Sequence, residues 1–188
     1  MKGWSDRWNR AKTKELRAAD EVVAWLEQPA ARRRLPPTLV HNDWRLDNMA
    51  VAADDPGRCV AVYDWDMCTV GDPFTDLGTL LSSWYEPGEP YEFLSPMPSR
   101  VAGLPDARRS DRALRPRAAR RDVSTMPYYY VFGLFKMAGV VQQLYFRWKQ
   151  GQTQDARMSG GEAVAEGLIG LAHDQHEPTR VVARVGAS

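Results

Sequence analysis

Apolar residues recur every three or four positions in three stretches, which predicts amphipathic helices over residues 5–28, 127–149 and 161–172. The first stretch ends before the segment RRRLPP, because proline cannot continue a helix. Trp8 and Trp25 lie within it, and Trp4 directly precedes it. The second predicts a core helix without a cofactor role, with an apolar stripe formed by Leu134, Met137, Val141, Leu144 and Trp148.

Short apolar runs between the first two helices predict strands over residues 38–40, 49–52 and 59–65. The turn ADDPGR joins the last two of these strands into a hairpin. Residues 71–84 then predict a helix that Asp72 caps, with Pro73 at the first helical position, where its missing N–H costs nothing.

Two segments show no such pattern. Residues 86–100 predict a proline-rich loop, and residues 106–121 combine seven arginines with one large apolar residue, Leu114. The second segment has no face that could pack, and regular patterning returns only at Asp122. A compensated frameshift in GC-rich DNA would produce such a stretch, a hypothesis that translating the alternate frames would test.

Composition narrows the class of protein. The chain has 188 residues, 44% of them apolar, which suits one domain or a little more with a real core. The net charge of +1 predicts no nucleic-acid partner, and Lys136, Gln142 and Gln143 interrupt the most apolar stretch, which predicts no membrane span. Two cysteines without metal-ligand spacing, and a start without an apolar segment, favour a cytoplasmic location.

Acidic and carboxamide residues gather in two short stretches, HNDWRLDN at residues 41–48 and VYDWDMCTVGDP at residues 62–73. Phosphoryl transfer needs a carboxylate that orients the attacking hydroxyl, together with oxygen ligands that hold Mg²⁺ against the phosphates. The spacing His-x-Asp-x-x-x-x-Asn supplies both from one loop, as His41, Asp43 and Asn48. Asp64, at the end of the predicted hairpin, fits a second metal carboxylate.

These stretches, continued by PFTDL, resemble the aminoglycoside phosphotransferase and choline kinase family, the small-molecule relatives of protein kinases. The likeness is greatest to the phosphotransferase domains associated with acyl-CoA dehydrogenases. It is sharp over residues 38–85, and residues 126–157 are similar to the C-terminal helices of that subgroup. The resemblance implies an α+β fold: a mostly helical, protein-kinase-like C-lobe whose small β-hairpin carries the catalytic and metal-binding loops.

The resemblance also implies roles for single residues. Asp43 would be the catalytic base, and Asn48 and Asp64 would bind Mg²⁺ and thereby the nucleotide, ATP or GTP. Asp66 is a candidate further metal ligand or simply a surface acid.

Three more positions have implied or alternative roles. Arg45 would contact phosphate oxygens or form a salt bridge with Asp47. His41 would shape the loop by hydrogen bonding, and Asp76 would brace the catalytic loop from inside the fold.

A kinase of this kind also needs an N-lobe with a phosphate-covering loop and a strand lysine. Only 40 residues precede His41, and they predict a helix and a linker. We therefore expect an N-terminal helix and linker over residues 1–37, a phosphotransferase C-lobe over residues 38–175 with an irregular insert at 86–122, and a tail over residues 176–188. The N-lobe would be missing, or would be a separate chain.

The sequence is compatible with three functions. The first is the C-terminal lobe of an ATP-dependent O-kinase that transfers the γ-phosphate to a substrate hydroxyl, with low activity alone. The second is a non-catalytic, pseudokinase-like module that pairs with another chain through an exposed apolar surface, to which the N-terminal tryptophans would contribute. The third is a Mg²⁺-dependent hydrolase, and the spacing of the acidic residues favours it least.

The acceptor substrate is less constrained than the reaction. The subgroup points to a hydroxyacyl-CoA-like compound, and the shortage of acids in residues 84–150 argues against a polycationic aminoglycoside. Three aromatic residues are expected to line the acceptor pocket: Tyr128, Tyr129 and Trp148.

Overall fold

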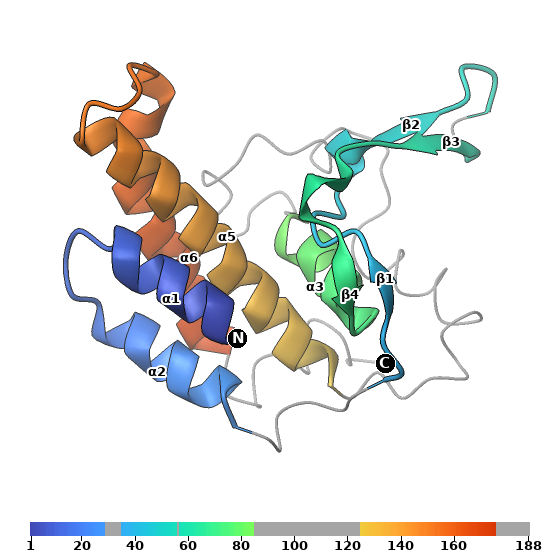
Figure 1. Ribbon diagram of the computed structural model, residues 1–188. Helices are drawn as coiled ribbons and strands as arrows, with labels where there is room; N and C mark the ends of the chain where they lie inside the picture. Colours follow the sequence, from blue (N-terminus) through green and yellow to red (C-terminus); the bar gives the residue numbers. More distant parts are fainter. Residues whose placement is uncertain (29–34, 56, 85–124, 176–188) are drawn as a thin grey trace.

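Helices make up most of the computed structural model, which describes residues 1–28, 35–55, 57–84 and 125–175. Four of them gather on one side of the molecule, and the fifth lies with the strands on the other side (Figure 1). The helices are α1 (Lys2–Ala11), α2 (Arg17–Leu26), α3 (Phe74–Ser82), α5 (Met126–Lys149) and α6 (Gly161–Gln175). The predicted α+β, mainly helical fold is thus confirmed, as are the long helix 127–149 and the last helix, which continues to Gln175.

The predicted helix over residues 5–28 is wrong, because the chain forms two helices there. After α1 the backbone becomes extended at Lys12, and α2 begins only after Leu16 (Figure 1). The Gln142 side chain on α5 donates to the Ala11 carbonyl over 3.0 Å and to the Thr13 hydroxyl over 3.1 Å. These tertiary hydrogen bonds stabilise the break, which repeating apolar positions alone do not reveal.

The core lies where α5 and α6 pack against the two N-terminal helices. Its most enclosed side chains come from three of these helices: Val22, Leu26, Leu134, Phe135, Leu168 and Ile169. Trp8 is only 3% exposed and contacts the Phe135 ring, and Trp4 and Trp25 also pack against the core. The expectation that these tryptophans form an exposed surface is therefore wrong, since their bulk fills the core instead.

Helix α3 approaches α5 so closely that their backbones touch. A Cβ atom added to Gly78 would lie 2.2 Å from the Tyr129 carbonyl oxygen, and one added to Gly133 would lie 2.5 Å from the Gly78 carbonyl oxygen. Only glycine permits this approach. The contact fixes α3, which carries Asp76, against the helical side of the molecule.

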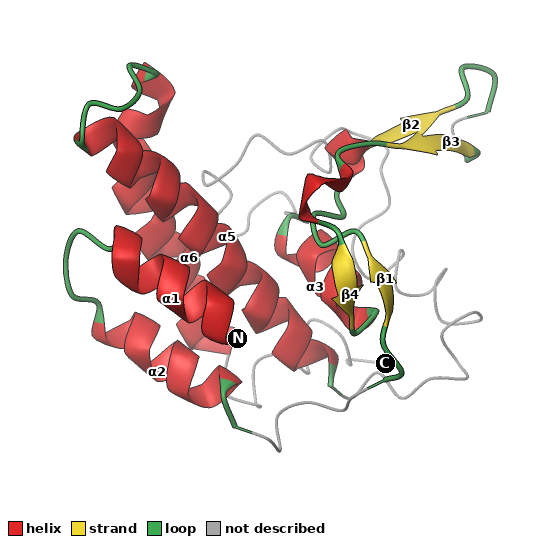
Figure 2. Ribbon diagram, in the orientation of Figure 1, coloured by secondary structure: helices red, strands yellow, loops and turns green. Residues whose placement is uncertain are grey.

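The described residues form two antiparallel two-stranded sheets, of which one lies next to α3 and the other extends away from the helices (Figure 2). Strand β1 (Thr38–Val40) pairs with β4 (Thr69–Gly71), and β2 (Met49–Val51) pairs with β3 (Cys59–Val62). The hairpin was predicted with longer strands, and β4 was not predicted, because three residues are too short to show a periodicity.

No helix within the described ranges is long and apolar enough to cross a membrane. The predicted proline-rich loop, the arginine-rich segment and the tail fall in residues 85–124 and 176–188, outside the described residues.

Candidate active site

The segment between β1 and β2, residues 41–48, forms the candidate catalytic loop. Its first two peptide N–H groups donate to the Asp76 carboxylate on α3, from His41 over 2.8 Å and from Asn42 over 2.6 Å. A carboxylate that accepts two backbone hydrogen bonds satisfies two donors that would otherwise lack partners in this tight loop. Asp76 therefore anchors the start of the loop to the helical side.

His41 connects this loop to the loop after β3. Its side chain is 1% exposed, its Nδ1 accepts from the Asp43 N–H over 3.2 Å, and its Nε2 lies 2.7 Å from the Tyr63 carbonyl oxygen. Since Nδ1 accepts, Nε2 carries the proton and donates to Tyr63. Both ring nitrogens thus bind backbone atoms, which is an arrangement that shapes the loop and leaves no nitrogen for proton transfer.

Asp43 and Asn48 lie at the two ends of one turn of the loop and bind each other. The Asn48 amide donates from Nδ2 to the Asp43 carbonyl oxygen over 2.9 Å and to Asp43 Oδ2 over 3.1 Å. Asn48 is 8% exposed, whereas Asp43 is partly exposed. This contact leaves Asp43 Oδ1 and Asn48 Oδ1 for a ligand.

The β2–β3 ladder brings Asp64 next to Asn48. The Tyr63 N–H donates to the Asn48 carbonyl oxygen over 2.8 Å, so Asp64 follows directly on the residue paired with Asn48. Asp64 adopts a left-handed conformation (φ 61°, ψ 59°) and is exposed, as is Asp66 in the 3-10 turn Trp65–Met67. Asp64 therefore lies at the surface of the molecule, where β3 ends.

Asp64 shares its unusual backbone with one other residue, Asn42 (φ 63°), and within the described residues these two are the only non-glycine residues with positive φ. Non-glycine residues rarely occupy this region, and such strain is common at functional sites. Asn42 lies in the candidate catalytic loop, and Asp64 lies in the loop that follows β3.

The available ligand atoms suit a hard cation. The Asn48 amide oxygen and the Asp64 carboxylate are oxygen donors of the kind Mg²⁺ prefers, and Mg²⁺ usually completes its shell with water and phosphate oxygens. The described residues contain no group of three or more His, Cys, Asp or Glu side chains that could hold a metal ion without a further ligand. A two-ligand site that depends on a bound nucleotide fits both observations.

Two further predicted residues have partners in the structure. The Arg45 guanidinium lies 3.1 Å from the Asp47 carboxylate, which is one of the two alternatives for this residue, and its buried Nε has no hydrogen-bond partner among the described residues. The predicted start of α3 is wrong by one position, because Pro73, and not Asp72, is the N-cap residue and Phe74 is the first helical residue. The Asp72 carboxylate still accepts from three groups: the N–H of Phe74, the N–H of Leu35 and the hydroxyl of Tyr129.

The predicted aromatic lining of the acceptor pocket is wrong for two of its three residues. Tyr128 and Tyr129 are 5% and 4% exposed and belong to the core. Tyr128 donates its hydroxyl to the Leu26 carbonyl, so it ties α5 to α2. Trp148 is partly exposed and stacks on Tyr145 near the end of α5.

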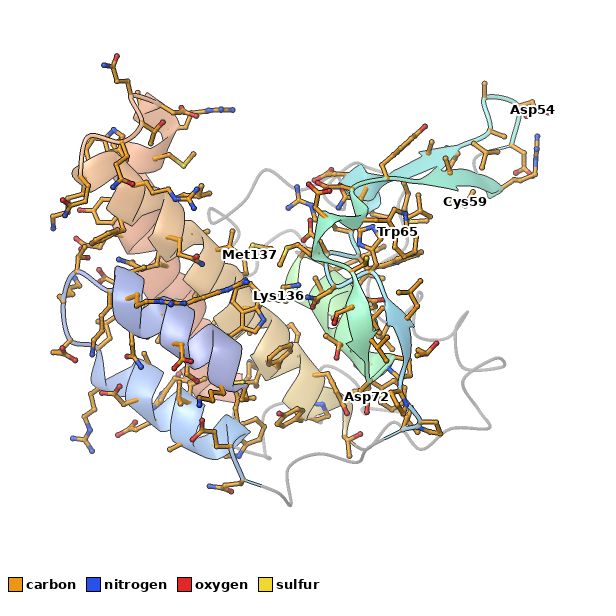
Figure 3. The ribbon with its side chains drawn as sticks, viewed as in Figure 1. Asp54, Cys59, Trp65, Asp72, Lys136 and Met137 are labelled. Atoms are coloured by element: carbon orange, nitrogen blue, oxygen red, sulfur yellow. The ribbon has the colours of Figure 1, made fainter. Side chains whose placement is uncertain are left out.

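Lys136 is a site residue that the sequence pattern did not identify. It lies in the middle of α5, is 3% exposed, and donates from Nζ to Asn42 Oδ1 over 3.2 Å (Figure 3). Burial lowers the pKa of its ammonium from 10.5 to about 8, although the carboxylates of Asp43 and Asp76 favour the charged form. A lysine interrupting an apolar helix was the available signal, but it indicated only that the helix does not span a membrane.

Comparisons with known proteins identify relatives of this chain. The chain is 26% identical over 174 residues to mouse acyl-CoA dehydrogenase family member 10 and 25% identical over 149 residues to human acyl-CoA dehydrogenase family member 11. These matches cover 91% and 79% of the chain, but only 16% and 19% of the length of the two relatives.

A solved structure has the same fold. It is the crystal structure of a putative aminoglycoside phosphotransferase from Ralstonia eutropha, with a TM-score of 0.73 and 24% identity. The match covers 94% of this chain and 54% of the other. The family model described as the phosphotransferase enzyme family (APH) matches residues 1–120, and the chain therefore belongs to that family.

Proposed function

We propose that the chain carries the catalytic centre of an ATP-dependent small-molecule O-kinase that transfers the γ-phosphate to a substrate hydroxyl. The observation that carries this proposal is the direct contact of Asp43 with Asn48 on one loop, beside Asp64 from the next. A base and two oxygen ligands at one point are what phosphoryl transfer requires from side chains.

Asp43 is the residue that acts on the acceptor. Because Asn48 occupies its Oδ2, Oδ1 is the atom that would orient the hydroxyl and accept its proton. The His41 ring and the Asp76 carboxylate hold the backbone on either side of Asn42, so the position of Asp43 is set before substrate binds. Positioning of this kind supplies much of the rate in phosphoryl transfer.

Asn48 and Asp64 would hold Mg²⁺, with Asp66 as a further candidate ligand. The metal, when bound, neutralises charge on the nucleotide phosphates. Arg45 would add positive charge by exchanging Asp47 for a phosphate oxygen, which its single contact with that carboxylate permits. ATP is the expected nucleotide, with GTP as the alternative.

The positive charge between α1 and α5 favours an anionic acceptor, such as a hydroxyacyl-CoA-like compound, over an aminoglycoside. Helix α5 contains no acidic residue. A groove of about 270 Å³ between α1 and α5 is lined by three arginines, Arg7, Arg10 and Arg147, and by no acid among the described residues. By helix geometry, Arg147 lies roughly 16 Å along α5 from Lys136, which contacts the candidate catalytic loop. This separation suits an acceptor whose phosphates lie away from its hydroxyl.

Calorimetry with Mg²⁺ and ATP tests the proposed function. We expect wild-type protein to bind, Asp64→Ala to abolish binding, and Asp54→Ala to bind like wild type. Asp54 is a matched control because it is an exposed acid at the far end of the hairpin (Figure 3). Equal binding by all three proteins, or no binding by wild type at millimolar ATP, would contradict the proposal.

A second candidate function is a non-catalytic module that pairs with another chain, such as a separate N-lobe. It is favoured by large apolar side chains that the sheets expose: Leu39, Val51, Val60, Tyr63, Trp65 and Val70. An exposed surface of this kind is typical of interaction sites. Binding of a separately expressed N-lobe without nucleotide, lost in Leu39→Glu, would support this function over the first.

A further inference from the structure

Lys136 is the one buried ammonium among the described residues, and it lies against the candidate catalytic loop. Full burial of a lysine is rare, because the charged group loses its water. Its charged neighbours come from three elements: Asp43 on the loop and Asp76 on α3 favour the ammonium, and Arg7 on α1 opposes it. The Trp4 ring, 5.7 Å away, covers it from the side of α1.

The contact that Lys136 makes determines the orientation of an amide. Its ammonium can only donate, so the Asn42 oxygen must face α5, and the Asn42 nitrogen then faces the opposite way. That nitrogen donates to the Met67 carbonyl over 3.1 Å, in the turn that follows Asp64. The side chain of Asn42 thus joins α5, the catalytic loop and the candidate metal loop in one chain of hydrogen bonds.

The backbone conformation of Asn42 explains why these side-chain hydrogen bonds affect the position of Asp43. It is left-handed, with φ 63°, and it immediately precedes Asp43. A strained residue keeps its conformation only when its surroundings fix it. The Asn42 N–H is fixed by Asp76 and its side chain by Lys136 and Met67, so Lys136 supplies one of the three restraints on Asn42, in the turn that presents Asp43.

We propose that Lys136 is a positioning residue of the phosphotransfer site, which fixes the Asn42 amide and thereby aligns Asp43 with the loop that carries Asp64. This inference rests on the proposed function of Asp43 and Asp64. The buried charge lowers the stability of the helical side, and the reason it is present is the order it gives the loop.

Hydrogen exchange of the full chain, followed by NMR, tests the proposal with the variant Lys136→Met. We expect the amides of His41, Asn42 and Asp43 to exchange about tenfold faster, since one restraint on their hydrogen bonds is lost. Exchange in α6 should stay unchanged, and the melting temperature should equal or exceed that of wild type, because a buried charge has been removed.

Two variants serve as controls. Lys149→Met removes the exposed lysine at the end of α5 and should leave exchange in residues 41–43 unchanged. Lys136→Arg retains a charged donor and should restore most of the protection that methionine loses. In phosphotransfer assays, Lys136→Met should lower kcat about tenfold with little change in the acceptor KM, as expected when only alignment is lost.

Unchanged exchange at residues 41–43 in Lys136→Met would overturn the inference. So would a lower melting temperature with faster exchange throughout the described helices, because Lys136 would then be an ordinary structural residue. Calorimetry of the wild-type chain with Mg²⁺ and ATP tests the proposed function separately. A chain that fails to bind Mg²⁺ with ATP, yet shows the loop-specific exchange, would refute the proposed function and leave the restraint by Lys136 intact.

Discussion

The helical side of this molecule, which comprises α1, α2, α3, α5 and α6, and its loop side, which comprises the strands and their connecting loops, are stabilised by different interactions. On the helical side, apolar side chains fill the core, and Gly78 and Gly133 let α3 and α5 touch. On the loop side, polar groups hold the backbone, two residues are left-handed, and the strands expose apolar side chains. Asp76 on α3 and Lys136 on α5 both bind the catalytic loop, so fold stability and site geometry meet at those residues.

The largest effect is expected on the helical side, from Gly78→Ala. The added methyl would lie 2.2 Å from the Tyr129 carbonyl oxygen, so the two helices must separate. We expect a loss of about 3 kcal/mol or more in the free energy of unfolding, measured by urea denaturation. Gly3→Ala is the control, since its methyl would meet nothing within 4 Å and alanine favours a helix. Equal stability of the two variants would show that the close approach is not required.

Asp76→Asn tests the connection between the two sides. The amide can accept from only one of the two N–H groups that the carboxylate binds, and its own NH₂ opposes the other. We expect a loss of roughly 2–3 kcal/mol in stability, together with weaker binding of Mg²⁺ and ATP. Thermal unfolding and calorimetry measure the two effects. A variant that loses only binding would show that Asp76 is not part of the fold.

Lys136 should make stability depend on pH. Its pKa in the folded chain, about 8, is below the usual 10.5, so between these values the unfolded chain binds more protons and stability rises with pH. From pH 7.5 to 9.5, wild type should gain about 2 kcal/mol relative to Lys136→Met. Urea denaturation of both proteins at each pH measures the difference. Parallel curves would show that the ammonium is not buried in the folded chain.

The smallest effect is expected at the sheets. Leu39 and Val70 are 62% and 71% exposed, so Leu39→Ser and Val70→Ser should change stability by less than about 0.5 kcal/mol. Thermal unfolding measures this. A large loss would mean that these strands support the fold, and the contrast between the two sides would then be weaker than the structure indicates.

Periodicity in the sequence predicted the long helices of the fold. Helix α5 was predicted within one residue at its start, although its buried residues lie on several sides of the helix and Leu144 of the predicted stripe is 38% exposed. The break after α1 and the strand β4 were not predicted, since each depends on distant partners: Gln142 for the break and β1 for the strand. Short-range patterns contain no information on such contacts.

In the candidate site, too, residues close in sequence were predicted and a residue distant in sequence was not. The spacing of His41, Asp43 and Asn48 identified the loop, because one turn of chain places these residues together. Lys136 contacts the loop across 94 positions of sequence and was not identified. Tyr128 and Tyr129 were assigned to a pocket, but in the fold both belong to the core.

In the proposed function, Asn48 and Asp64 form one metal–nucleotide site with Asp43. The most direct measurement is an NMR titration with Mn²⁺ and ATP, because the paramagnetic ion broadens only the signals near it. We expect broadening to begin at the amides of Asn48 and Asp64 and to spare Gly57 at the far end of the hairpin. Broadening centred elsewhere, or equal broadening along the hairpin, would contradict it.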